Sequence, residues 1–140
     1  MFEGFERHDI ETEDARIASF VGGSGPPLLL LHGYPQTHIA RHRLAPALAQ
    51  DYTVVATDLR GYGDSRGPQQ VDAAAYSKRT MARDQLAVMK HFGFHRFGLI
   101  DRSKDGPFPV VIFNPRSSRT PCSARSSRFL PDTRVDQVGI

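Results

Sequence analysis

The chain has 140 residues, a formal net charge of +3, one cysteine and no tryptophan. This length suffices for one modest domain with a single hydrophobic core. Because Cys122 is alone, it cannot form an intrachain disulfide, which argues against an oxidised secreted scaffold.

No segment of the sequence is typical of secretion or membrane insertion. The first twenty residues are charged and lack the apolar region of a secretory signal. The longest apolar run, residues 26–31, is far too short to span a membrane. We therefore expect a cytoplasmic protein that binds no membrane.

The excess of basic residues lies at the C-terminal end of the chain. Residues 101–140 hold seven Lys or Arg and four Asp or Glu, whereas the first hundred residues hold eleven of each. The arginines of residues 116–128 are separated by Ser and Pro without interleaved aromatic residues, so we expect no nucleic-acid binding. Val110–Phe113 could form a strand, but Asn114–Ile140 shows no regular period and few apolar residues, which predicts an irregular, disordered tail.

The N-terminal segments are predicted to form strands. Phe5–Ile10 and Ala15–Val21 alternate imperfectly between polar and apolar residues and are predicted to form a hairpin. After the break GGSGPP, the apolar run Leu28–Gly33 is typical of a strand buried on both faces of a parallel sheet.

The first predicted helix spans His38–Gln50. Its apolar residues Ala40, Leu44 and Leu48 recur at every fourth position, which places them on one face. Because proline disrupts a helix interior, Pro46 should kink this helix or delay its start.

A second helix is predicted from Ser77, a plausible N-cap, to about Phe92, with Gly93 placed to end it. Its predicted apolar face consists of Ala82, Leu86 and Met89. Asp84 lies in its middle near Arg83 and could anchor it.

The helices alternate with apolar strands, at Tyr52–Asp58 and Phe97–Ile100. Parallel strands need crossover connections of this kind, so the sequence predicts an α/β domain with a parallel βαβαβ unit.

The sequence HGYPQT, which follows the first apolar strand, is a candidate functional motif. His32 and Gly33 permit a sharp turn, after which the backbone amide of Tyr34 can form one half of an oxyanion hole. The sequence DLRGYGDS follows twenty-five residues later. We expect its first residue, Asp58, to fix the loop through hydrogen bonds to backbone amides, not to act as an acid.

The histidines offer no metal site. His38 and His42 have the spacing of metal ligands, but no third ligand accompanies them, so both are expected at the surface. We expect neither a metal nor a cofactor.

Three segments, residues 22–37, 52–68 and 73–100, resemble the N-terminal third to half of an α/β-hydrolase. More narrowly, HGYPQT and YSKRTMARDQ are similar to haloacetate (fluoroacetate) dehalogenases and their epoxide-hydrolase relatives. The resemblance covers residues 1–102, which would form an incomplete α/β-hydrolase domain, followed by an unrelated tail, residues 103–140.

The resemblance implies a hydrolase that removes halide from a small halo-carboxylic acid, or opens an epoxide. Asp101 would be the nucleophile, and Arg102 would bind the substrate carboxylate. His32, Gly33 and Tyr34 would form the oxyanion and substrate-binding loop.

The sequence departs from the family pattern around Asp101. Leu99 and Ile100 stand where the family has Gly-His, Ser103 replaces a glycine, and Asp105 replaces a second arginine. No histidine follows Asp101, although the family uses a later one as the base. We expect a truncated or frame-shifted product, which leaves three alternatives open: a hydrolase, a catalytically inactive fragment, or a non-enzymatic protein that pairs with itself or a partner through an open sheet edge.

Overall fold

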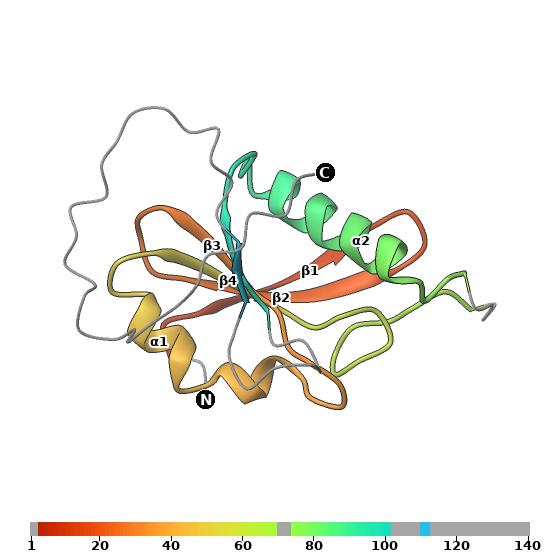
Figure 1. Cartoon of the computed structure of the whole chain (residues 1–140), viewed down its shortest axis with the longest axis horizontal. Coiled ribbons are helices and arrows are strands. Elements are labelled where there is room, and N and C mark those ends of the chain that lie inside the picture. The colour runs from red at the N-terminus through yellow and green to blue at the C-terminus, as the bar shows by residue number, and fades with distance from the viewer. Residues whose placement is uncertain (1–2, 70–73, 102–109, 113–140) are drawn as a thin grey trace.

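The structure is a computed structural model that describes residues 3–69, 74–101 and, as a strand, 110–112. Arg102, Cys122 and the segment Asn114–Ile140, which was predicted to be disordered, lie outside the described residues. The described chain forms one mixed sheet with a helix on each side, so the predicted α/β class is confirmed (Figure 1).

The sheet has six strands in the order β1-β2-β4-β3-β5-β6. The pair β1–β2 is an antiparallel hairpin, and β2 pairs antiparallel with β4. Strand β3 is parallel to both β4 and β5, whereas β5 and β6 are antiparallel. The strands are β1 Glu6–Glu11, β2 Arg16–Gly22, β3 Pro27–Leu30, β4 Thr53–Thr57, β5 Gly98–Asp101 and β6 Val110–Ile112.

The central strand β3 is apolar throughout because both faces of the sheet are covered. Leu29 packs in a cluster with Val88 and Met89 of helix α2, which spans Lys78–His91. Leu28 and Leu30 point to the opposite face, into a second cluster that contains Ala45. Successive strand side chains alternate between faces, so an uninterrupted apolar run is required there.

The predicted helix His38–Gln50 is in fact two short pieces. A 3-10 turn, η1, spans His38–Arg41, and helix α1 spans Leu44–Leu48. Pro46 is the third residue of α1, in the first turn, where a backbone N–H has no helical partner to lose. Of the predicted face, Ala40 and Leu44 are exposed, whereas Leu48 is partly buried against the second cluster. The fully buried residues of the two pieces are His38, Arg41 and Ala45.

The ends of α2 follow the prediction, but its buried face does not. Ser77 Oγ accepts a hydrogen bond from Thr80 N at 3.2 Å, and Gly93 has a φ of 76° just past the helix. Leu86 is 58% exposed and Ala82 is also exposed, so of the predicted face only Met89 is buried. The buried residues are Asp84, Gln85, Val88 and Met89.

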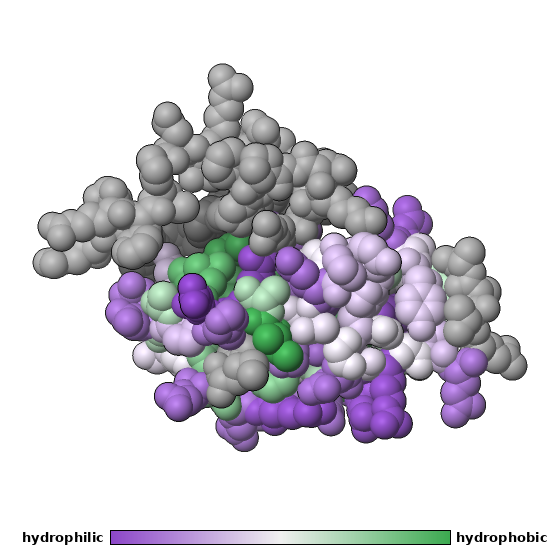
Figure 2. Space-filling model, turned by 90° about the horizontal axis from the view of Figure 1, so that it is seen from below, coloured by the Kyte–Doolittle hydropathy of each residue, from purple (hydrophilic) through white to green (hydrophobic). Residues whose placement is uncertain are grey.

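The side of the molecule that carries η1 and α1 leaves apolar side chains at the surface. Ile39 is 46% exposed and Leu44 is 36% exposed. Figure 2 views the molecule from this side and shows apolar side chains gathered beside polar ones.

Strand β5 is paired on its outer side with β6, which lies in the segment Val110–Phe113 where a further strand was predicted. Among the described residues, no helix is long and apolar enough to cross a membrane.

Candidate active site

The C-terminal ends of β3 and β5 bring the described site residues to one edge of the sheet, namely His32, Gly33, Tyr34 and Asp101. Leu31 N donates to Ile100 O at 2.9 Å, so the chain leaving β3 runs beside the end of β5. His32, Gly33 and Tyr34 follow on this segment. In open α/β sheets, ligands bind outside the carboxyl ends of the strands, so this edge is the candidate active site.

His32 is buried, and each of its ring nitrogens has a partner. Nδ1 lies 3.2 Å from Gly33 O, a carbonyl that can only accept, and Nε2 accepts from Leu59 N at 3.0 Å. These partners assign the neutral tautomer with the proton on Nδ1. Burial lowers the pKa of His32 below its ordinary value of 6.5, against a smaller opposing effect of the Gly33 carbonyl.

Asp58 Oδ1 lies 3.7 Å from His32 Nε2, within the distance of an ion pair. The Nε2 lone pair faces the Leu59 amide, so this nitrogen carries no proton to share with the carboxylate. His32 therefore links the two loops and is not available as a base.

The segment after His32 forms a tight turn. Gly33 O accepts from Gln36 N at 2.7 Å, and the Tyr34–Pro35 peptide bond is cis. The Tyr34 ring is 62% exposed and meets the Tyr62 ring edge-on, with centroids 6.2 Å apart. The use of the Tyr34 amide as an oxyanion donor stays a prediction.

Asp58 is completely buried at the end of β4 and gathers three N–H donors. Its Oδ1 accepts from His38 N at 2.6 Å, and its Oδ2 accepts from His38 Nδ1 at 2.7 Å and from Asp64 N at 3.0 Å. The predicted loop-fixing role of Asp58, through backbone amides, agrees with these contacts. Its bond to a histidine ring was not foreseen.

The prediction that both histidines of the pair lie at the surface is wrong for His38. His38 is 8% exposed, and its ring stacks on Phe20 with centroids 4.1 Å apart. His42 is exposed, and its Nδ1 lies 2.9 Å from Ile39 O. Among the residues that the structure describes, no three His, Cys, Asp or Glu side chains group as a metal site.

Asp101 is the last residue of β5 and is half-buried. It is in register with Val110 of β6, so the strand ladder continues through it. A nucleophile of the family that the sequence resembles would lie on a sharp turn after its strand. Its role as nucleophile stays a prediction, as does that of Arg102, which lies outside the described residues.

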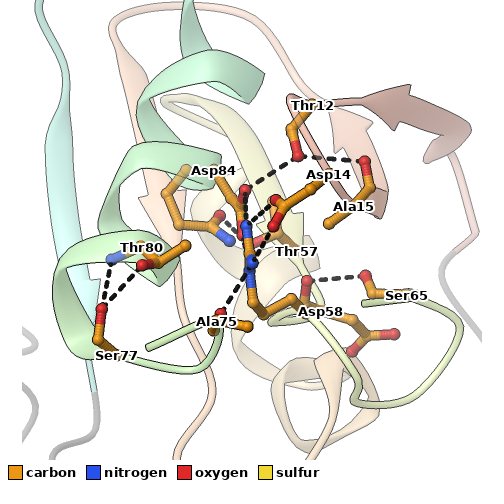
Figure 3. Close-up of polar contacts among 12 residues, drawn as sticks. Thr12, Asp14, Ala15, Thr57, Asp58, Ser65, Ala75, Ser77, Thr80 and Asp84 are labelled. Carbon is orange, nitrogen blue, oxygen red and sulfur yellow. Dashed lines mark hydrogen bonds and ion pairs between the residues drawn. The ribbon is translucent and has the colours of Figure 1, made fainter. Parts of the chain in front are cut away.

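Arg60 forms a buried ion-pair cluster that the sequence did not reveal (Figure 3). Its Nε and Nη2 donate to the two carboxylate oxygens of Asp84, at 2.6 and 2.7 Å. Nη2 and Nη1 donate to Asp14 at 2.8 and 3.2 Å, and Nη1 also donates to Ala75 O at 2.8 Å. All five N–H groups of the guanidinium therefore have an acceptor.

The cluster anchors α2, but through Arg60 and not through the neighbouring Arg83. The hydrogen bonds to Asp84 and Asp14 raise the pKa of Arg60, against the opposing effect of burial. A cavity of about 500 Å³ opens beside the cluster, between Glu13, Thr80 and Arg83. None of the predicted site residues lines it.

Comparison with known proteins decides the family. The model of the α/β hydrolase fold family matches residues 26–100, more than half of the chain. This chain belongs to the α/β-hydrolase family.

The relatives of this α/β-hydrolase chain include a dehalogenase and an epoxide hydrolase. It is 52% identical over 107 residues to the fluoroacetate dehalogenase of Burkholderia sp, covering 76% of this chain and 35% of that protein. It is 39% identical over 99 residues to the soluble epoxide hydrolase of Corynebacterium sp. (strain C12), covering 71% of this chain and 33% of that protein.

A solved α/β-hydrolase structure from Nostoc sp PCC 7120 is 52% identical, with a TM-score of 0.70, covering 74% of this chain and 36% of that one. The hydrolase chain therefore spans about a third of the length of the relatives it matches.

Proposed function

We propose that this chain acts as a haloacetate dehalogenase-like hydrolase in which Asp101 displaces halide from a small halo-carboxylic acid. The 52% identity to a fluoroacetate dehalogenase is the observation that carries the proposal. The position of Asp101 at the end of β5, beside the segment that leaves β3, also supports it.

In the proposed first step, a carboxylate oxygen of Asp101 attacks the carbon that bears the halogen. A carbon–oxygen ester bond forms, the carbon–halogen bond breaks, and halide leaves with the bonding electrons. The step consumes no proton, so it needs the carboxylate and a substrate held in line, but no general base.

Hydrolysis of the resulting ester does need a base to activate water. His32 is not suited to it, because its Nε2 accepts from Leu59 N, and the sequence holds no histidine after Asp101, where the family has its base. We therefore expect the ester on Asp101 to persist in this chain.

A second candidate is a chain without catalytic activity, which could instead pair with itself or a partner through a sheet edge. The observation that favours it is the strand ladder at Asp101, since pairing with Val110 limits how far the carboxylate can be presented.

Incubation of the purified chain with fluoroacetate tests both candidates. We expect about one fluoride ion released per chain, because the ester blocks its own nucleophile, and a carboxymethyl ester located at Asp101 by mass spectrometry. Asp101→Asn should release none, whereas Asp51→Asn, which removes an exposed carboxylate, should behave like the parent chain.

Absence of both fluoride and ester would overturn the proposal and favour the inactive chain. Repeated turnover would support dehalogenation and contradict the persistence of the ester.

A further inference from the structure

Asp58 joins the two sequence motifs of the site, HGYPQT and DLRGYGDS. We propose that its carboxylate positions residues 32–38 and thereby directs the Tyr34 N–H toward the Asp101 carboxylate, where it would hold one oxygen while the other attacks the substrate. The catalytic part of this inference rests on the proposed function, whereas the positioning of the segment does not.

The backbone of Asp58 is fixed to the sheet. Asp58 N donates to Ala18 O of β2 at 3.0 Å, and Asp58 O accepts from Ser65 Oγ at 2.8 Å. Ser65 Oγ also accepts from Ala18 N at 2.9 Å. The carboxylate therefore extends from a rigid part of the fold.

The segment between β3 and η1 is held at its start and at its end. At its start, Leu31 N bonds to Ile100 O, and Leu31 O accepts from Arg41, whose Nε lies 3.1 Å away. At its end, Asp58 binds both the backbone N and the ring Nδ1 of His38. Between these anchors lies the turn that contains Tyr34, so a shift of His38 would move the Tyr34 amide.

The pocket around the Asp58 side chain suits a carboxylate and not an amide. Three N–H groups converge on its two oxygens. An asparagine could accept on one oxygen only, and its NH₂ group would face at least one N–H donor. Gly63 completes the fit, because a Cβ at this position would overlap Asp58 Oδ2.

Asp58 acts through the loop and not on the substrate. Its side chain has no exposed surface, and each oxygen already has an N–H partner. It is therefore a positioning residue and not a catalytic residue.

Hydrogen exchange of the whole chain, compared between the parent and Asp58→Asn, tests the positioning. Loss of a buried charge-assisted hydrogen bond should make the amides of residues 33–38 exchange at least about tenfold faster. The amides of β1 and β2 should exchange as in the parent chain. Unchanged exchange at 33–38, or equal acceleration throughout the chain, would overturn the proposal.

A milder variant keeps the test decisive if Asp58→Asn does not fold. His38→Gln retains the bond from residue 38 N to Asp58 and removes the ring contact with Asp58 together with the stacking on Phe20, so it should give a smaller acceleration at the same residues. Faster amide exchange only outside residues 33–38, or unchanged exchange throughout the chain, would count against the proposal. Asp51→Asn serves as the control, since this exposed carboxylate precedes β4 and so lies at the opposite end of that strand from Asp58.

The rate of ester formation from fluoroacetate tests the catalytic part of the proposal. His38→Gln should lower the rate at saturating fluoroacetate and leave the half-saturating concentration unchanged, because the substrate still binds, whereas the displaced Tyr34 amide no longer holds the Asp101 carboxylate in position to attack. An unchanged saturating rate would refute the catalytic part. Failure of the parent chain to form any ester would refute the proposed function, and the exchange experiment would still decide the positioning.

Discussion

Arg60 and Asp84 form a two-point ion pair in the interior of the protein, with the guanidinium 1% and the carboxylate 3% exposed. The pair joins the loop after β4 to the middle of α2. Asp14, at 43% exposure, completes the cluster from the hairpin turn. One arginine side chain thus links three segments that are distant in sequence.

Replacement of Arg60 should destabilise the fold strongly. Arg60→Met keeps much of the side-chain volume but leaves Asp84 buried without a cation. We expect a loss of about 3–5 kcal/mol in the free energy of unfolding, the range for breaking one side of a buried pair. Chemical denaturation followed by circular dichroism measures it.

Arg79→Met is the matched control, because Arg79 is exposed on the same helix. Its effect should stay within about 0.5 kcal/mol. Similar losses for the two variants would contradict the structural role of the Arg60 cluster.

Gly63 should tolerate no side chain. It has a φ of 52°, and an added Cβ would overlap the buried carboxylate of Asp58. Gly93 has a similar positive φ of 76°, with open space around the position of its Cβ. Because both variants place a side chain at a positive φ, the backbone strain is common to the two. The difference in stability between Gly63→Ala and Gly93→Ala therefore measures the effect of the overlap with Asp58.

Thermal melting of the two alanine variants measures this difference. We expect Gly93→Ala to cost about 1 kcal/mol and Gly63→Ala about 1–3 kcal/mol more, the range for overpacking. Equal melting temperatures would show that the Asp58 carboxylate can move aside.

The succession of strands and helices along the chain followed from the sequence, because it depends on local patterns. The uninterrupted leucines of β3 predicted a strand covered on both faces, and Ser77 and Gly93 predicted both ends of α2. The burial of Asp84 and His38 could not be predicted from the sequence. Each depends on a polar partner that is remote in sequence: Arg60 lies 24 residues from Asp84, and Asp58 lies 20 residues from His38.

The same reason explains which parts of the candidate site could be predicted. The motifs HGYPQT and DLRGYGDS indicated loops of possible functional importance at the ends of β3 and β4, because glycines and turn formers follow apolar strands there. The hydrogen bonds that connect the motifs, from Leu59 N to His32 and from His38 to Asp58, arise only when the parallel strands align.

The pH dependence of stability should carry a contribution from His32. Burial lowers the pKa of His32 in the folded chain. Below pH 6.5 the unfolded chain therefore binds a proton at this residue that the folded chain does not bind. Stability therefore falls as the pH drops below 6.5, by at most about 1.4 kcal/mol per pH unit from this group.

Denaturation at a series of pH values, in the parent chain and in His32→Gln, isolates this contribution. Glutamine can accept from Leu59 N but does not titrate, so the variant should lose less stability between pH 7 and pH 5. His42→Gln removes an exposed imidazole and should retain the pH dependence of the parent. Identical slopes for the parent and His32→Gln would contradict a neutral, buried His32.

The face of α2 that packs on the sheet can be tested with two apolar residues of that helix. The spacing in the sequence placed Leu86 and Met89 together, but Leu86 is 58% exposed and Met89 is fully buried among Leu29, Val55 and their neighbours. Met89→Ala should cost about 2–5 kcal/mol, because it leaves a cavity in the core. Leu86→Ala should change stability by less than about 0.5 kcal/mol, since it removes mainly solvated surface. Measured by chemical denaturation, a loss for Leu86→Ala as large as that for Met89→Ala would support the face that the sequence predicted, which contains both residues. It would also require Asp84 and Gln85 to turn away from Arg60 and Thr57.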